Sequence, residues 1–173
     1  MNVILVKLIA NLDDCSIFEA YKGLFENLEA KGYKPKMNVD NQATKFIKQL
    51  LTKKDCDLQV VEPHNHRVNA AERAIQTIKD VFIATLATTD QDFCLQLWDK
   101  LAPQVQNTLN LLRASRLNPN ISAYEALNGP YNWDRYPLVP PGCKAVIYEA
   151  PAVCGLWALQ GTYAWLLGPS EDH

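Results

Sequence analysis

Short apolar segments alternate with amphipathic helical patterns over the first half of the chain, and few folds accept that order. Four consecutive apolar residues within residues 2–9 predict a buried strand. Asp13 or Asp14 can cap a helix over residues 15–31, and Gly32 can end it. This alternation is typical of α/β proteins, which is the fold class that we expect. Further strands are predicted over residues 36–39 and 58–61, and further helices over residues 42–53, 69–87, 95–113 and 122–127.

The pattern changes after Pro130, where prolines become frequent and helical periodicity fades. Short strand patterns follow at residues 144–149, 156–159 and 163–167. We therefore expect a small β-rich segment behind the α/β region. The division that we predict is an α/β region at residues 1–129, a linker at residues 130–137 and a β-rich segment at residues 138–173.

Composition excludes two broad classes of protein. The chain is 48% hydrophobic and 21% charged, which argues against disorder. No apolar run approaches the roughly 18 residues needed to span a bilayer, so we expect no membrane partner.

The five cysteines are odd in number and scattered without a C-x-x-C pair, which is typical of reduced thiols in an intracellular protein. Whether the compartment is nuclear or cytoplasmic stays open.

The near-neutral net charge of −2 conceals a lysine-rich stretch. Residues 22–54 carry eight lysines against Glu26, Glu29 and Asp40, so their net charge is +5. Such a segment can bind a polyanion. The alternative is that these lysines lie on ordinary solvated helix faces.

Two carboxylates occupy positions suited to chemistry. Asp40 follows a predicted strand, at the kind of sheet edge where α/β proteins gather ligands. Glu72 opens the long predicted helix, and Gln76 and Lys79 share its face at i+4 and i+7. Converging carboxylates can hold two Mg²⁺ ions for phosphoryl transfer. The alternative is that Asp40 is a turn residue and Glu72 an ordinary first-turn helix acid.

Several sequence motifs are spread over nearly the whole chain. The most specific are PHNHRVNAAERAIQTIKD at residues 63–80 and VDNQATK at residues 39–45. These motifs closely resemble those of copia-type retrotransposon integrases. The resemblance implies a ribonuclease-H-like catalytic core that uses Asp, Asp and Glu with two Mg²⁺ ions to process and join DNA ends. It also implies an SH3-like β segment behind that core. Shorter likenesses lie in LWDK, NTLNLLRASR, SAYEALNGP, PPGCKAVIYEAP and YAWLLGP.

The resemblance assigns roles to particular residues. Asp40 corresponds to the second aspartate of the family and Glu72 to its glutamate, so both are the implied catalytic and metal-binding residues. The side chains implied to lie beside DNA are Asn65, Asn69, Gln76 and Lys79.

The resemblance also implies missing parts. Matching backwards from Asp40 makes residues 2–9 the third strand of the core, so its first two strands and first aspartate are absent from these residues. We therefore expect a ribonuclease-H-like core without its first two strands, impaired Mg²⁺ binding and weak DNA binding.

Three functional hypotheses stay open at this point. The first is an integrase-like polyprotein fragment that retains DNA affinity without complete catalysis. The second is an active Mg²⁺-dependent polynucleotidyl transferase whose first aspartate comes from an upstream segment. The third is a non-catalytic protein-interaction module derived from a retroelement. One partner open to such a module is a second copy of the same chain, which would give a homo-oligomer.

Overall fold

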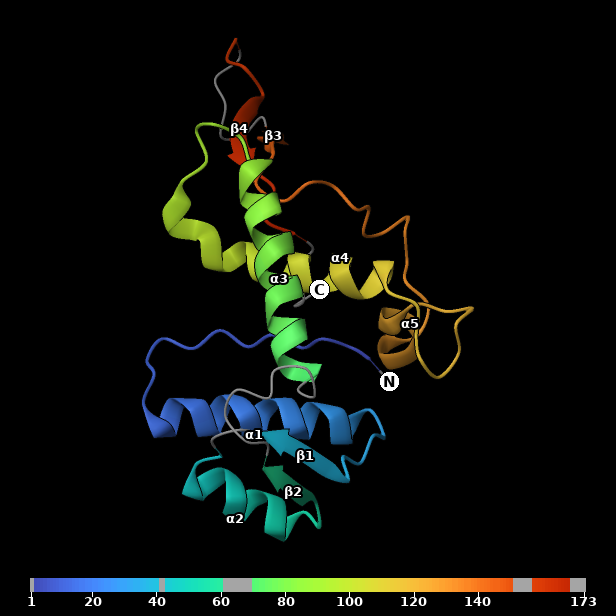
Figure 1. The fold of residues 1–173 in the computed structure, drawn as a ribbon. Coiled ribbons are helices and arrows are strands. Elements are labelled where there is room, and N and C mark those ends of the chain that lie inside the picture. Colours follow the sequence, from blue (N-terminus) through green and yellow to red (C-terminus); the bar gives the residue numbers. More distant parts are fainter. Residues whose placement is uncertain (1, 41–42, 61–69, 151–156, 169–173) are drawn as a thin grey trace. The chain divides into compact units, whose positions relative to one another are not determined.

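The computed structural model describes residues 2–40, 43–60, 70–150 and 157–168 (Figure 1). Helices and two small sheets alternate along the chain, so the coarse α/β prediction is confirmed. The chain divides into two compact units. One unit is Val3–Thr77, and the other is Met1–Asn2 together with Ile78–His173.

The first unit is built around a parallel pair of strands. Its elements are α1 (Asp14–Ala30), β1 (Met37–Asp40), α2 (Lys45–Lys53) and β2 (Asp57–Val60), followed by the start of α3 (Ala70–Ala87). The two strands lie side by side in Figure 1, in a register that runs from Met37↔Asp57 to Asp40↔Val60. Parallel neighbours need a crossover connection, and α2 provides it. The helices and strands predicted between residues 15 and 61 are therefore confirmed.

Local sequence signals set the bounds of α1. The Asp13 side chain accepts hydrogen bonds from the Ser16 backbone N–H at 3.0 Å and from the Ser16 hydroxyl at 2.6 Å. At the other end Gly32 adopts a φ of +82°, a conformation that favours glycine. Both predicted helix boundaries are thus confirmed. The core that α1 and α2 share consists of Phe25, Ile47, Leu51 and Cys56, with Ile17, Phe18, Tyr21, Ala43 and Leu58 packed against it.

The strand predicted over residues 2–9 is wrong. That segment carries no strand, although Ile4 is buried. A strand needs a neighbour for its backbone groups, and among the described residues β1 and β2 pair only with each other. The Asn2 side chain instead bonds to backbone within the second unit. Its Nδ2 donates to the Ala114 carbonyl at 3.0 Å, and its Oδ1 accepts from the Arg116 N–H at 3.1 Å.

The second unit carries the remaining helices. After α3 come a 3-10 turn η1 (Leu95–Leu97), α4 (Trp98–Leu112) and α5 (Ala123–Asn128), close to the predicted bounds. None of the described helices is both long and apolar enough to cross a bilayer. The apolar core of this unit lies mainly on α4 and α5 and includes Leu101, Val105, Leu109, Ala123 and Leu127.

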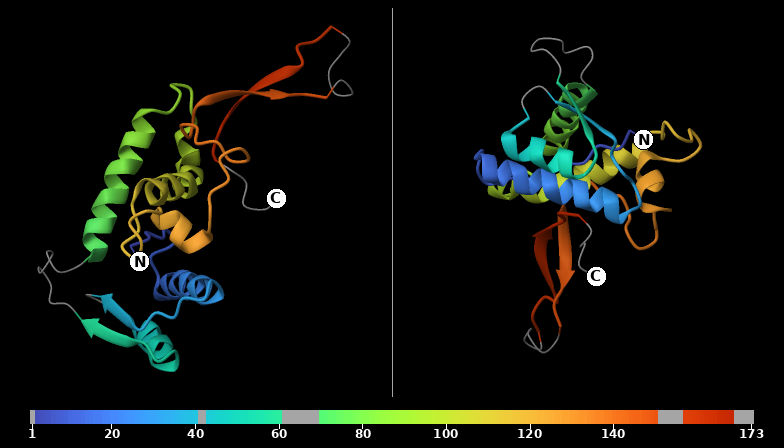
Figure 2. Two further views of the ribbon diagram at one scale, coloured as in Figure 1. Left: turned by 90° about the vertical axis from the view of Figure 1, so that its right-hand side faces the viewer. Right: turned by 90° about the horizontal axis from the view of Figure 1, so that it is seen from below.

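The C-terminal segment folds as a hairpin in its described part. β3 (Lys144–Tyr148) and β4 (Gly161–Trp165) pair antiparallel, so two of the three predicted strands are confirmed (Figure 2). The strand predicted at residues 156–159 is wrong for its described residues, which turn the chain toward β4. Trp157 is 97% exposed there, so its apolar side chain has no surface to pack against and does not order a strand.

Candidate nucleic-acid interface

Asp40 lies where the sequence predicts it, at the end of a strand. It is the last residue of β1, opposite Val60, and it is half-buried. Burial, with the charges of Cys56 and Asp40, raises the pKa of the Tyr21 phenol to about 12. Asn38 shares a face of β1 with Asp40, and its Nδ2 is buried without a hydrogen-bond partner in the described structure.

Glu72 occupies the first turn of α3 and is half-buried. Because the predicted helix is present, Gln76 and Lys79 follow on the same face, and both are exposed. The other two residues implied to lie beside DNA, Asn65 and Asn69, are outside the described residues.

The helical period places Ala71, Ile75, Ile78, Phe82 and Leu86 on one apolar face of α3, and that face is covered only in part. Its later members Ile78, Phe82 and Leu86 are half-buried, but Ala71 and Ile75 are exposed, Ile75 by 66%. A helical period marks which residues share a face, but it does not show how far along the helix other elements cover that face.

The described residues do not fit a two-metal magnesium site. Such a site needs several converging carboxylates around two cations. Within residues 2–40, 43–60, 70–150 and 157–168, no three His, Cys, Asp or Glu side chains gather closely enough to hold a metal ion. Asp40 and Glu72 are two carboxylates where more are needed, so we derive no catalytic step through a metal.

The structure reveals a basic face on α2, which the net charge of residues 22–54 does not locate. The helix KFIKQLLTK contains no acidic residue. It buries Ile47 and Leu51, while the residues at i, i+3, i+4, i+7 and i+8 from its start are exposed. Applying the helical period within residues 45–53 would have found this face. We call it the lysine face; it consists of Lys45, Lys48, Gln49, Thr52 and Lys53.

The charges of the lysine face are not neutralised by neighbours in the described structure. Elsewhere in the described structure, ion pairs join Lys54 to Glu29, Lys100 to Asp99 and Lys144 to Asp92. None of these pairs involves Lys45, Lys48 or Lys53. Three ammonium groups and two polar side chains therefore lie together on one solvated surface, which suits phosphate oxygens along a nucleic-acid backbone.

The chain matches no protein-family model. No curated protein matches it at a significant level either. A function for this chain therefore rests on its own residues and their geometry.

Proposed function

We propose that this chain is a retrotransposon-integrase-like segment that binds DNA through the lysine face of α2 and has an incomplete metal site. The observation that carries the proposal is the lysine face itself. Its three lysines form no ion pair among the described residues, and α2 contains no acid to oppose a phosphate. Lysines that neutralise phosphates release counterions, which gives binding that does not depend on base sequence.

The order of elements supports the integrase resemblance. A ribonuclease-H-like core is expected to continue with helix, strand, helix, strand and helix after its first three strands. The first unit has α1, β1, α2 and β2 in that order and is followed by α3. Asp40 ends β1 and Glu72 lies in the first turn of α3, which are the positions that the resemblance implies for the second aspartate and the glutamate.

DNA binding can be tested by charge removal at matched positions. Lys45, Lys48 and Lys53 are replaced together by glutamine, and fluorescence anisotropy measures affinity for a labelled duplex at low salt. The control triple, Lys54→Gln, Lys100→Gln and Lys144→Gln, removes the same charge from lysines already paired with acids. We expect about a tenfold weaker affinity for the first triple and a much smaller change for the control. Equal losses would contradict a specific role of the lysine face.

Catalysis is tested separately from binding. We propose that this chain alone neither cleaves nor joins DNA ends, because no three metal-ligating side chains gather among its described residues, whereas the reaction needs several converging carboxylates. A nicking assay with supercoiled plasmid and added Mg²⁺ should give no product. Mg²⁺-dependent cleavage that disappears in both Asp40→Asn and Glu72→Gln would overturn this part of the proposal.

A further inference from the structure

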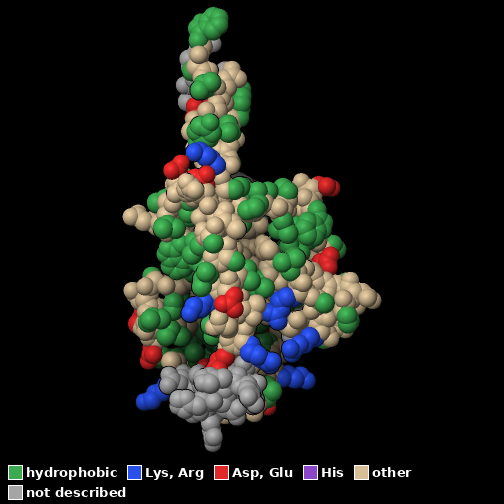
Figure 3. Space-filling view, turned by 45° about the horizontal axis from the view of Figure 1, so that its top comes forward, with side chains coloured by type: hydrophobic (Ala, Val, Ile, Leu, Met, Phe, Trp, Pro, Cys, Tyr) green, Lys and Arg blue, Asp and Glu red, His purple; other side chains and the backbone are tan. Residues whose placement is uncertain are grey.

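The hairpin exposes an unusual amount of apolar surface for so small an element. We call β3, β4 and residues 157–160 the hairpin arm. Hydrophobic side chains follow it along the face seen in Figure 3, and Tyr163 is 73% exposed. The other large exposed apolar residues of the arm are Val146, Ile147, Tyr148, Trp157 and Leu159.

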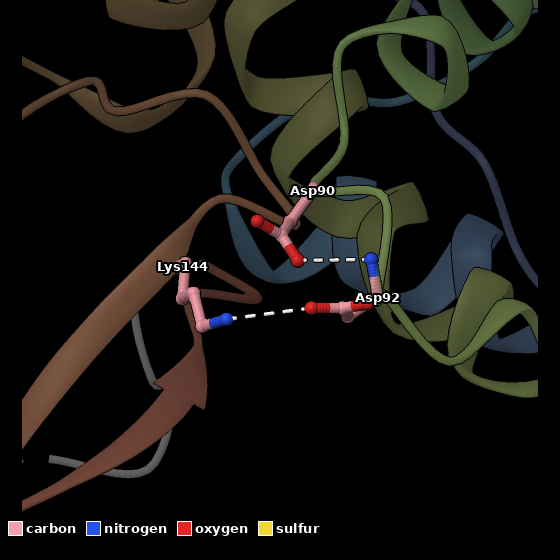
Figure 4. Close-up of polar contacts among 3 residues, drawn as sticks. All are labelled: Asp90, Asp92 and Lys144. Atoms are coloured by element: carbon pink, nitrogen blue, oxygen red, sulfur yellow. Dashed lines mark hydrogen bonds and ion pairs between the residues drawn. The ribbon is translucent and has the colours of Figure 1, made fainter.

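Among the described residues, the contacts that anchor the arm to its unit lie at its base. The Asp90 N–H donates to the Gly142 carbonyl at 3.0 Å, and the Trp165 ring packs edge-on to Phe93 at 5.9 Å between centroids. Figure 4 shows the ion pair from Lys144 Nζ to the Asp92 carboxylate, 3.4 Å long. Beyond this base the arm is a two-stranded ribbon, which is marginally stable in water unless further strands or a packed face support it.

The two edges of the ribbon are protected differently. The β3 edge carries Lys144 and continues into Glu149, whereas residues 161–168 contain neither a charge nor a proline. Charges and prolines are the usual means by which an edge strand avoids pairing with another chain. The β4 edge therefore lacks protection, and within the described structure β4 pairs only with β3.

Hydrogen bonds show which backbone groups of β4 point outward. The Glu149 N–H donates to the Gln160 carbonyl, and the Leu166 N–H donates to the Cys143 carbonyl, both at 3.0 Å. Even-numbered residues of β4 thus direct their backbone groups toward β3. Because the direction alternates along a strand, the backbone groups of Gly161, Tyr163 and Trp165 point to the outer edge.

We propose that the β4 edges of two copies of this chain pair antiparallel, with Tyr163 on the two-fold axis. The outward backbone groups then meet in hydrogen-bonded pairs: Tyr163 with its own equivalent, and Gly161 with Trp165 of the second copy. The result is one four-stranded sheet in the order β3–β4–β4–β3. The register places no charged side chain of β4 opposite another, because residues 161–165 carry none.

The chemistry of the arm favours a second copy over a nucleic acid. Its one described basic residue, Lys144, is already bound to Asp92 and lies 4.9 Å from the centre of the Tyr163 ring. Identical surfaces carry identical charges, so self-association is least opposed at an uncharged edge, and residues 161–168 provide one. This inference does not depend on DNA binding by the lysine face.

The first test is the oligomeric state of the whole chain by analytical ultracentrifugation. The unsubstituted chain should dimerise, and Tyr163→Lys should weaken the dimer about tenfold by placing like charges opposite each other on the axis. Tyr148→Lys is the matched control, because Tyr148 is an exposed tyrosine on the neighbouring strand β3. The Tyr148→Lys variant should still dimerise. A monomeric unsubstituted chain, or equal effects of the two variants, would overturn the proposal.

The second test remains informative if Tyr163→Lys disturbs the hairpin. In the proposed register the Cα atoms of the two copies of residue 163 lie about 5.5 Å apart. This separation is within disulfide range, whereas the two copies of residue 162 lie beyond the roughly 7 Å limit. In a background with the exposed Cys15 replaced by serine, Tyr163→Cys should form a disulfide-linked dimer under mild oxidation and Thr162→Cys should not. Equal cross-linking of both variants would rule out this register.

Discussion

Lys54 Nζ lies 2.6 Å from the Glu29 carboxylate, so the end of α2 is tied to α1 by an ion pair. The same ammonium lies 6.0 Å from the centre of the Phe25 ring in the core of that unit. Lys54 is therefore a packed lysine, whereas Lys45, Lys48 and Lys53 face solvent without an acidic partner among the described residues. Within one lysine-rich stretch, the structure thus separates a lysine held in an ion pair from the three lysines that we propose bind DNA.

Glu29→Gln should strengthen DNA binding. The substitution removes a negative charge beside Lys54 and leaves that ammonium available to a phosphate. Because the pair is part-exposed, the free energy of unfolding should change by less than about 1 kcal/mol. Asp99→Asn removes the same charge from the Lys100 ion pair and is the control. Anisotropy titrations with equal affinities for the two variants would contradict this use of Lys54.

Leu101→Ala should destabilise the second unit strongly. Leu101 is 0% exposed in α4, so its truncation should lower the free energy of unfolding by about 2–5 kcal/mol. Leu112→Ala is the matched control in the same helix, because Leu112 is 78% exposed and its loss should cost under about 0.5 kcal/mol. All four tryptophans belong to this unit, so urea unfolding followed by tryptophan fluorescence reports on it. Similar costs for both leucines would contradict the packing of α4.

Ser122→Ala should weaken the start of α5. The Ser122 hydroxyl accepts from the Glu125 N–H at 3.0 Å, and the Glu125 carboxylate accepts from the Ser122 N–H at 2.9 Å. Loss of this reciprocal cap should lower the free energy of unfolding by about 0.5–2 kcal/mol. Ser122→Thr keeps a hydroxyl at the cap and should recover most of the loss in the same urea titration. If threonine fails to rescue, the cap is not the cause.

Tyr21→Phe should change how stability depends on alkaline pH. Burial raises the pKa of Tyr21 to about 12, assisted by the charges of Cys56 and Asp40. The folded state thus retains the phenolic proton after the unfolded chain releases it near pH 10, so stability falls as pH rises from about 10 to about 12. Phenylalanine has no proton to lose and should flatten that part of the profile. The exposed Tyr148→Phe should leave it unchanged in urea titrations at each pH.

Local patterns in the sequence were sufficient for the helices and for β1 and β2. Helical periods and caps such as Asp13 act within a few residues, so they can be read from short windows. Residues 2–9 were misassigned because a strand exists only where another strand accepts its hydrogen bonds. The error at residues 157–159 has a related cause, because Trp157 is 97% exposed and apolar residues alone do not provide a surface to pack against.

The candidate site was predictable to a similar extent. The position of Asp40 at a strand end follows from the strand prediction, and the shared face of Glu72, Gln76 and Lys79 follows from the helix. The lysine face was also within reach of the sequence, because the helical period over the predicted helix separates its exposed positions from Ile47 and Leu51. The anchor between Lys144 and Asp92 joins residues 52 positions apart, and no local pattern indicates such a contact.

The salt dependence of DNA binding shows whether the lysine face contacts phosphates. The logarithm of the affinity for a duplex is plotted against the logarithm of salt concentration for the unsubstituted chain and for the Lys45→Gln, Lys48→Gln and Lys53→Gln triple variant. Each lysine that contacts a phosphate contributes a slope of about 0.9, so the triple variant should be shallower by about 2.7. A slope that is unchanged in the triple variant would contradict DNA binding by the lysine face.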